Sequence, residues 1–504
     1  MPALFLRASA QRHFPDEPFD DEDARMTTTH PSAIRLTRDN AIAHYYQGLE
    51  LAAATIRAER AERAEHAERA GQGEGPQGSF SPAFTLPPLT PELTAYFGTS
   101  GMSMQDLATH RGRRLLFLDL MGNPGTLTTK TFASLVMVAR AVEHIRTTGE
   151  RILILTPTSG NKGTALRDAV ARAHAHGLVG ADQLRIVTVV PRQSLTKLRE
   201  SALSADEDTR RANPVALADV DSPAAVKDLA SQAAALARQA GLEEGGWRLW
   251  YSLDLDNYRL ADAARAFVEA DAFPLEADGA PRLHAHAVSS AYGLLGYHLG
   301  HRTLTSQTVP GLPVPARHPG FFLIQQLATP DMVLSLLKGS PAHELLPPYA
   351  LDPTTGLYHR GDDDGAFPAV THDPNEQIDP TFYTRAPVTS AQVNELIGRH
   401  GGGGIVVSLH ECLAFYPRLR RLLAPLGHEL PADPRDLREW SLVKAVTGVH
   451  LAIERDLVPE HAEIVIHGSG LYTDRLLAPL PQAHTTQVST AGDVSRLLLA
   501  AASA

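Results

Sequence analysis

The stretch Asn123-Pro124-Gly125-Thr126-Leu127-Thr128-Thr129-Lys130-Thr131-Phe132 decides the expected fold of this chain. It begins with turn-forming residues and leads into a run in which apolar residues recur at helical spacing, so Lys130 stands at the entry of an amphipathic helix. A strand-like run at 151–155 follows and ends on a second turn, Thr158-Ser159-Gly160-Asn161-Lys162-Gly163. This order of helix, strand and turn is typical of an α/β protein.

Lys130 and Asn161 carry side chains that suit one kind of chemistry. A lysine amine forms a Schiff base with an aldehyde cofactor, and an asparagine amide can hydrogen-bond to a phenolic oxygen on the cofactor ring. A lysine in the first turn opposes the helix dipole, whose field lowers the lysine pKa and favours the free amine. The alternatives are a surface lysine at a helix start and an asparagine that only caps the next helix.

These motifs resemble those of the threonine synthase group of fold-type II pyridoxal-phosphate enzymes, in the tryptophan synthase β-like superfamily. The lysine motif of that family is like Asn-Pro-Thr-Gly-Ser-Phe-Lys, which residues 123–130 match with one extra residue and a threonine in place of Phe. The second family motif is Ser-Ser/Thr-Gly-Asn-Thr-Gly, which residues 158–163 follow except at Lys162. Residues 251–259 are similar to the family segment Asn-Pro-Tyr-Arg, and residues 464–471 to a strand that ends in Thr-Gly-His-Gly-Leu. The four blocks occur in the order of the family.

The resemblance implies pyridoxal 5'-phosphate as the cofactor, Lys130 as the catalytic Schiff-base lysine, and Asn161 as a contact of the phenolic oxygen. It also implies that the turn after the strand meets the α-carboxylate of an amino-acid substrate, through Thr158, Ser159, Gly160 and Lys162. At Lys162 the family has a small hydroxyl residue instead. The charge of Lys162 either pairs with a second anionic group of the substrate or points to solvent, and the spacing leaves both readings open.

A third segment, Val288 to Gly296, follows a strand and opens a helix, which is the arrangement of an anion cradle at a helix N-terminus. The family has its phosphate loop here, so the resemblance implies cofactor-phosphate binding by Ser289, Ser290, Gly293 and Gly296. The alternative is a plain strand–helix turn. A dinucleotide site is disfavoured because the sequence lacks Gly-x-Gly-x-x-Gly at this place.

His467 takes the place of the family threonine that lies near the pyridine nitrogen, and Ser469 could supply the hydroxyl group instead. An imidazole can donate or accept a hydrogen bond. A satisfied core histidine is the alternative for His467. The chain has 23 histidines, including the pair His284 and His286, but no His-Glu-x-x-His or comparable cluster. No metal site is therefore expected.

Composition excludes several classes of protein. The net charge of −11 disfavours nonspecific binding to nucleic acid or to an anionic membrane. The single cysteine, Cys412, excludes an intramolecular disulfide. The sequence has no apolar run long enough for a transmembrane helix and no signal-peptide pattern at its N-terminus. A cytoplasmic enzyme is expected.

The length of 504 residues predicts two lobes rather than one core. Residues 1–100 are expected to hold a disordered leader (1–25), a solvated Ala-Glu-Arg spacer helix (57–70) and a linker (71–88). Residues 101–272 are expected to form the N-terminal lobe with the lysine and the Ser-Gly-Asn turn. Residues 273–504 are expected to form the C-terminal cofactor-binding lobe, with long insertions at 303–318 and 338–387.

Short apolar strands alternate with helical patterns, which predicts parallel sheets covered by helices on both faces. Strands are expected at 115–118, 152–155, 186–190, 249–252, 285–288, 321–324, 405–408 and 464–466. The expected fold is therefore a two-lobe α/β enzyme of fold type II with three-layer lobes, the cofactor in the cleft, and an N-terminal helical extension.

The function expected is that of a pyridoxal-phosphate-dependent lyase or synthase. It would act on an amino acid by β- or γ-elimination or replacement, in a specialised pathway rather than in threonine synthesis. The alternative is a noncatalytic descendant that keeps the fold as a binding or scaffold protein. The expected partner is a small-molecule amino acid, not nucleic acid or a membrane, and a homodimer is one assembly open to such an enzyme.

Overall fold

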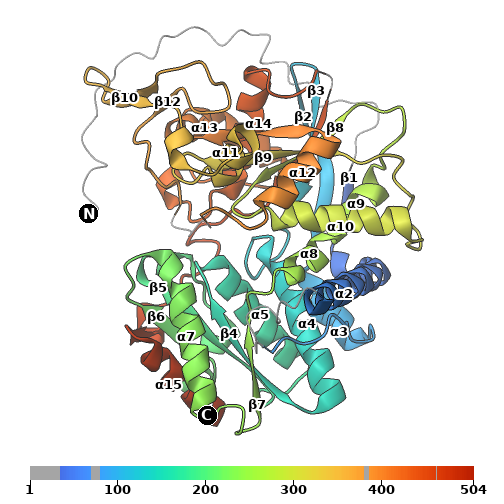
Figure 1. Cartoon of the computed structure of the whole chain (residues 1–504), viewed down its shortest axis with the longest axis vertical. Coiled ribbons are helices and arrows are strands. Elements are labelled where there is room, and N and C mark those ends of the chain that lie inside the picture. The colour runs from blue at the N-terminus through green and yellow to red at the C-terminus, as the bar shows by residue number, and fades with distance from the viewer. Residues whose placement is uncertain (1–34, 70–79, 380–384, 461) are drawn as a thin grey trace.

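The computed structural model describes residues 35–69, 80–379, 385–460 and 462–504, which form two lobes stacked along the long axis (Figure 1). Each lobe is built on one main sheet with helices on both faces. This confirms the expected α/β architecture of parallel-sheet lobes. The expected leader at 1–25 and residues 70–79 of the linker lie outside the described residues.

The larger lobe contains a seven-stranded sheet. Its order is β1 (Arg35–Arg38), β2 (Met102–His110), β3 (Arg113–Asp119), β14 (Glu463–Gly468), β8 (Arg282–Ala287), β9 (Gly320–Gln326) and β13 (Gly402–Val407). The strands from β3 to β13 run parallel, while β1 and β2 pair antiparallel at one edge. The parallel strands bring their carboxyl ends to the same edge of the sheet, where ligand sites of α/β proteins form.

Alternate residues of these strands serve two different cores. In β9, Phe322 and Ile324 pack with the core that contains α13 (Leu409–Leu423) and α14 (Ser441–Glu454). Phe321 and Leu323 point to the opposite core. The helices on that second face are α9 (Ala264–Ala272), α10 (Tyr292–Ser306), α11 (Asp331–Lys338) and α12 (Ser390–His400). A strand buried on both faces explains the unbroken apolar run that marked β9 in the sequence.

The smaller lobe holds a five-stranded parallel sheet. Its order is β15 (Thr486–Val488), β6 (Val215–Ala218), β5 (Leu184–Pro191), β4 (Arg151–Pro157) and β7 (Trp247–Tyr251). One face packs on α4 (Lys130–Thr148) and α5 (Asn161–Ala175), the other on α7 (Val226–Gln239) and α15 (Ala491–Ser503). The short helix α6 (Glu207–Ala212) lies in the same lobe and contacts α15.

All eight strands expected from the sequence overlap strands of the structure, but the lobes divide differently from the expected boundary at residue 272. β2 and β3 belong to the larger sheet, although they lie in the segment expected to form the N-terminal lobe. β15 and α15, from the end of the chain, belong to the smaller lobe. The reason is burial, because Val494 and Leu498 of α15 complete the apolar core beneath α7.

The N-terminal extension packs into an apolar core to which both lobes contribute. It comprises α1 (Ala41–His44), α2 (Tyr46–Arg69) and α3 (Pro91–Tyr96). The first half of α2 is buried, including Tyr46, Leu49 and Ile56, and it packs against α10 and α8 (Asp256–Asp262). This buried half lies before the expected spacer helix at 57–70, of which residues 57–66 are mostly exposed.

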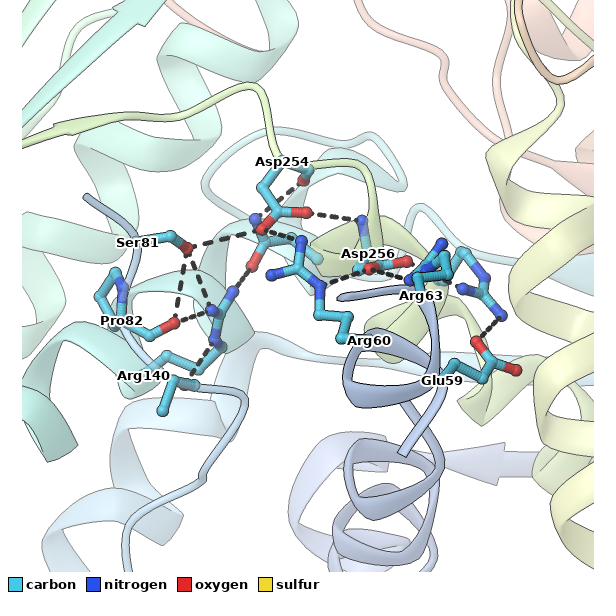
Figure 2. A network of polar contacts seen from close by, with 11 residues as sticks. Glu59, Arg60, Arg63, Ser81, Pro82, Arg140, Asp254 and Asp256 are labelled. Carbon is cyan, nitrogen blue, oxygen red and sulfur yellow. Dashed lines mark hydrogen bonds and ion pairs between the residues drawn. The ribbon is translucent and has the colours of Figure 1, made fainter. Parts of the chain in front are cut away.

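Arginines of the Ala-Glu-Arg repeat in α2 form ion pairs with carboxylates at the start of α8 and just before it. Arg60 bonds to Asp254 (2.8 Å) and Asp256 (2.9 Å), and Arg63 also reaches Asp256, as Figure 2 shows. On the other side of Asp254, the buried Arg140 donates to the carbonyl oxygen of Pro82. The bonds of Arg60 and Arg63 hold the segment 254–256, where Leu255 lines the pocket described below.

The insertion expected as a loop at 338–387 contains an antiparallel sheet of β10 (Tyr349–Asp352), β11 (Leu357–Arg360) and β12 (Val370–Thr371). The other expected insertion, 303–318, begins inside α10, which ends at Ser306. Among the described residues, no helix has both the length and the apolar character needed to cross a membrane.

Candidate functional site

A cavity of about 380 Å³ lies between the two lobes. The smaller lobe lines it with the starts of α4 and α5, and the larger lobe with the ends of β8 and β14 and the start of α10. Most of the residues expected at the site line this cavity: Lys130, Thr158, Ser159, Asn161, Lys162, Ser289, Ser290, Gly293, His467 and Ser469. Gly160 and Gly296 do not line it.

Lys130 is the first residue of α4, and the turn before it is held by side-chain hydrogen bonds. Asn123 Oδ1 accepts from Thr126 Oγ1 (2.8 Å) and Thr131 Oγ1 (2.9 Å), and Thr128 Oγ1 accepts from the Lys130 backbone N–H (3.3 Å). The Asn-Pro block therefore sets the direction in which α4 starts.

The Lys130 amine lies inside the cavity, with Nζ 5.0 Å from the centre of the Tyr258 ring. Burial lowers the pKa of Lys130, because desolvation disfavours the ammonium form. Asp262 opposes this effect on the pKa, and Arg265 adds to it. A larger fraction of the amine is therefore neutral, and so nucleophilic, than for a lysine in water.

Asn161 begins α5, and its amide is held on both sides. Nδ2 donates to Glu439 Oε2 (2.5 Å), and Oδ1 accepts from the Tyr472 hydroxyl (2.5 Å). Gly160 stands before it at φ +118°, where a Cβ would collide with the side chain of Lys197. Gly160 is therefore a requirement of the turn rather than a wall of the cavity.

Lys162 lines the cavity. Its Nζ donates to the carbonyl oxygen of Ser252 (2.6 Å). Burial lowers the pKa of Lys162 to about 7, and the charges of Lys130 and Lys227 contribute. Lys227 of α7 also lines the cavity, although the sequence offered no motif around it. Lys130, Lys162 and Lys227 therefore place three amines at this end of the site.

An acidic pair that the sequence did not reveal stands opposite the lysines. Glu439 accepts from Lys197 (2.8 Å), and Asp379 accepts from Lys444 (3.0 Å). Glu439 is buried, which disfavours its charged form, but Lys197 and Lys444 outweigh this and hold the Glu439 pKa well below its usual range. Asp379 comes from the long insertion, so no spacing rule connects it to the other residues of the wall.

The turn expected to bind phosphate lies at the N-terminus of α10. Ala291 is in the left-handed region (φ 51°), and its carbonyl accepts from Leu294 N (3.0 Å) and Leu295 N (3.2 Å). The backbone N–H groups just before these donors belong to the first turn, where a helix offers donors to an anion. A Cβ at Gly293 would lie 2.5 Å from Arg265 Nη1, so the glycine leaves room for the guanidinium.

Gly296 has a different role from the one expected. A Cβ at Gly296 would collide with Asp262 and would lie 3.0 Å from the carbonyl oxygen of Arg259. Both belong to α8, which packs closely on α10. Gly296 therefore permits the close packing of α10 on α8 and does not line the cavity.

His467, near the end of β14, is buried, and its ring lies next to the guanidinium of Arg265. Arg265 Nη1 lies 3.2 Å from His467 Nδ1, and Arg265 Nη2 donates to Thr129 Oγ1 (2.9 Å). On its other side, His467 Nε2 lies 2.8 Å from His284 Nδ1. Burial, followed by the neighbouring histidines and Arg265, lowers the His467 pKa well below its ordinary value. Arg265 was missed because it sits in an ordinary helical pattern.

Comparison with protein-family models gives one result. Residues 37–502 match the model described as "Family of unknown function (DUF6002)". The chain belongs to this family. Comparison with curated protein sequences finds no match.

Comparison with solved structures finds similar enzymes. Threonine synthase from Escherichia coli is 17% identical, with 76% of this chain and 78% of that chain covered and a TM-score of 0.47. PLP-bound threonine synthase from Brucella melitensis is 14% identical, with 77% of this chain and 79% of that chain covered and a TM-score of 0.45. An L-serine ammonia-lyase from Rhizomucor miehei is 13% identical, with 82% of this chain and 97% of that chain covered and a TM-score of 0.44.

Proposed function

We propose that this protein is a pyridoxal-phosphate-dependent lyase or synthase of the fold-type II class. The observation that carries the proposal is the Lys130 amine, which stands in a cavity between two lobes with its pKa lowered. A buried amine of this kind is suited to bond to an aldehyde. When bound, the cofactor supplies that aldehyde and a ring that withdraws electrons from the α-carbon of an amino acid.

The residues around Lys130 fit this cofactor. The α10 N-terminus offers backbone donors for its phosphate, at the turn that carries Ser289, Ser290 and Gly293. Arg265, packed against Gly293, adds a positive charge beside the same turn. Asn161, oriented by Glu439 and Tyr472, presents an amide to the cavity.

The proposed reaction is a β- or γ-elimination or replacement on an amino acid. Lys130 Nζ, once free, takes the α-proton of the substrate, because its lowered pKa leaves a neutral amine to accept it. The substrate α-carboxylate binds at the start of α5, where Thr158, Ser159 and Asn161 line the cavity. Leu253 and Leu255 line the cavity as well.

We infer that the substrate carries a second anionic group. The support is the buried charge of Lys162, which faces the cavity together with Lys227. A cation in place of a small hydroxyl residue favours a phosphate, a phosphonate or a side-chain carboxylate. This favours a specialised amino-acid reaction over threonine synthesis.

One spectrum separates this function from the noncatalytic alternative. Purified protein mixed with pyridoxal phosphate should develop a visible absorbance band that sodium borohydride removes. Amino acids that are substrates should then shift the band and release an oxo acid, ammonia or a replaced product. A protein that stays colourless and binds no cofactor would leave only the binding or scaffold role.

A further inference from the structure

Three buried histidines of β8 and β14 lie together beside the cavity, and two of them, His286 and His467, line it. They are His284, His286 and His467, and one ring nitrogen from each lies within 4.8 Å of the others. Spacing of this kind could hold a metal ion. Their hydrogen bonds argue for a different use.

Arg265 fixes the direction of the hydrogen bonds in this group. A guanidinium has no lone pair to offer, so it donates to His467 Nδ1 (3.2 Å), and a neutral His467 must carry its proton on Nε2. His467 Nε2 then donates to His284 Nδ1 (2.8 Å). His284 in turn carries its proton on Nε2 and donates to Glu269 Oε1 (3.2 Å). Both nitrogens of His467 and of His284 are therefore in use.

The chain of hydrogen bonds from Arg265 ends on the carboxylate of Glu269. It is fully enclosed, which raises its pKa, but His284 and Arg282 outweigh this effect and lower the Glu269 pKa to about 2. Arg282 Nη1 donates to Glu269 Oε1 (2.8 Å), so the carboxylate is charged and paired. A metal ion could not take the lone pairs of His467 and His284 without breaking this chain.

His286 takes no part in this chain of hydrogen bonds. Its ring stacks on His467, with ring centres 3.8 Å apart, and it lines the cavity. Its side chain is 4% exposed, and its Nε2 has no hydrogen-bond partner among the described residues. A buried polar atom without a partner destabilises a fold, so such atoms in native proteins call for an explanation such as a ligand or a bound water.

We propose that His286 is a ligand-binding residue of this cavity, whose imidazole donates a hydrogen bond to an acceptor atom of the bound cofactor. The inference rests on the proposed function. The nearby positive charge of Arg265 favours an acceptor over a donor at this place. Burial, Arg265 and His284 lower the His286 pKa well below its ordinary value, which keeps the ring neutral.

The test compares His286→Leu, His286→Gln and His284→Leu with the wild-type protein. Cofactor-free stability is measured by urea unfolding, and binding by titration with pyridoxal phosphate and with pyridoxal, which lacks the phosphate. His286→Leu should leave cofactor-free stability unchanged or raised, and should weaken pyridoxal phosphate binding about tenfold. His286→Gln, which keeps a donor, should recover part of the affinity. An equal loss for pyridoxal places the acceptor on the ring, and a loss for pyridoxal phosphate alone places it on the phosphate.

Other outcomes overturn the inference. If His286→Leu binds both compounds like the wild type, or lowers cofactor-free stability as His284→Leu should, then His286 is a structural residue. Stoichiometric metal in the purified protein that is lost in His286→Leu would instead make it a metal ligand. A wild-type protein that binds neither compound removes the proposed function itself, and the inference with it.

Discussion

Glu439 Oε2 accepts a hydrogen bond from Asn161 Nδ2 at 2.5 Å, and this bond joins the two lobes at the wall of the cavity. Lys197 donates to the same oxygen at 2.8 Å, while Ser441 N donates to the other carboxylate oxygen at 3.0 Å. The Asn161 amide is therefore held in one orientation by residues far from it in the chain. The Asn161 amide nitrogen carries two N–H groups, and its bond to Glu439 uses one of them.

We predict that Glu439→Ala destabilises the protein by about 3–5 kcal/mol, because it leaves the buried Lys197 charge without its nearest partner. Urea unfolding measures the difference. The control is Glu395→Ala, which removes a carboxylate from an exposed helix pair with Arg399. This control should change the free energy of unfolding by at most about 0.5 kcal/mol. Equal effects of the two changes would contradict the role given to Glu439.

Lys130 should be the only residue onto which sodium borohydride reduces the cofactor. The reason is that its amine stands in the cavity at the start of α4, whereas the Lys162 amine donates to the carbonyl oxygen of Ser252 (2.6 Å). Peptide mapping after reduction checks this, and Lys130→Ala should yield no labelled peptide. Label on Lys162 or Lys444, which also line the cavity, would show that another amine reacts.

Lys162→Thr should weaken binding of an amino acid with a second anionic group about tenfold or more, and should change binding of a neutral amino acid little. The wild-type preference should also depend on pH. The Lys162 pKa is lowered to about 7, so its charge is present at pH 6 and mostly lost at about pH 8. Affinity for the anionic substrate should therefore fall as the pH rises through 7.

Spectral titration of the cofactor-loaded protein at both pH values measures this effect. The neutral amino acid serves as the matched ligand control in each protein. Equal losses for charged and neutral amino acids in Lys162→Thr would remove Lys162 from substrate recognition.

Gly293→Asp should weaken binding of pyridoxal phosphate about tenfold or more. The added carboxylate sits at the N-terminus of α10 next to Arg265, where it repels the phosphate and takes the guanidinium as its partner. Gly398→Asp is the control, because Gly398 lies in α12 with open space around it. Normal cofactor affinity in Gly293→Asp would place the phosphate elsewhere.

Gly296→Ala should instead lower the stability of the protein rather than its affinity for the cofactor. Its Cβ would collide with Asp262 of α8, so we expect a loss of about 1–3 kcal/mol of stability from overpacking. Thermal unfolding without cofactor detects this loss. A stable Gly296→Ala protein with weak cofactor binding would restore Gly296 to the binding turn.

Much of the local structure followed from the sequence. The apolar runs of β4, β5 and β9 were recognisable because strands buried on both faces exclude polar residues. The start of α4 at Lys130 followed from turn residues and helical periodicity. The short strands β6 and β15 were not expected from the sequence.

What the sequence determined by itself was the succession of helices and strands and the residues at their ends, including Lys130, Asn161 and the turn at Ser289. These features depend on interactions between near neighbours in the chain. The tertiary structure alone decided which distant side chains meet them. Arg265, Glu439 and His286 reach the cavity because parallel strands return to one edge and helices pack across the lobes. Such meetings depend on long-range burial and pairing of charge, which no local pattern encodes.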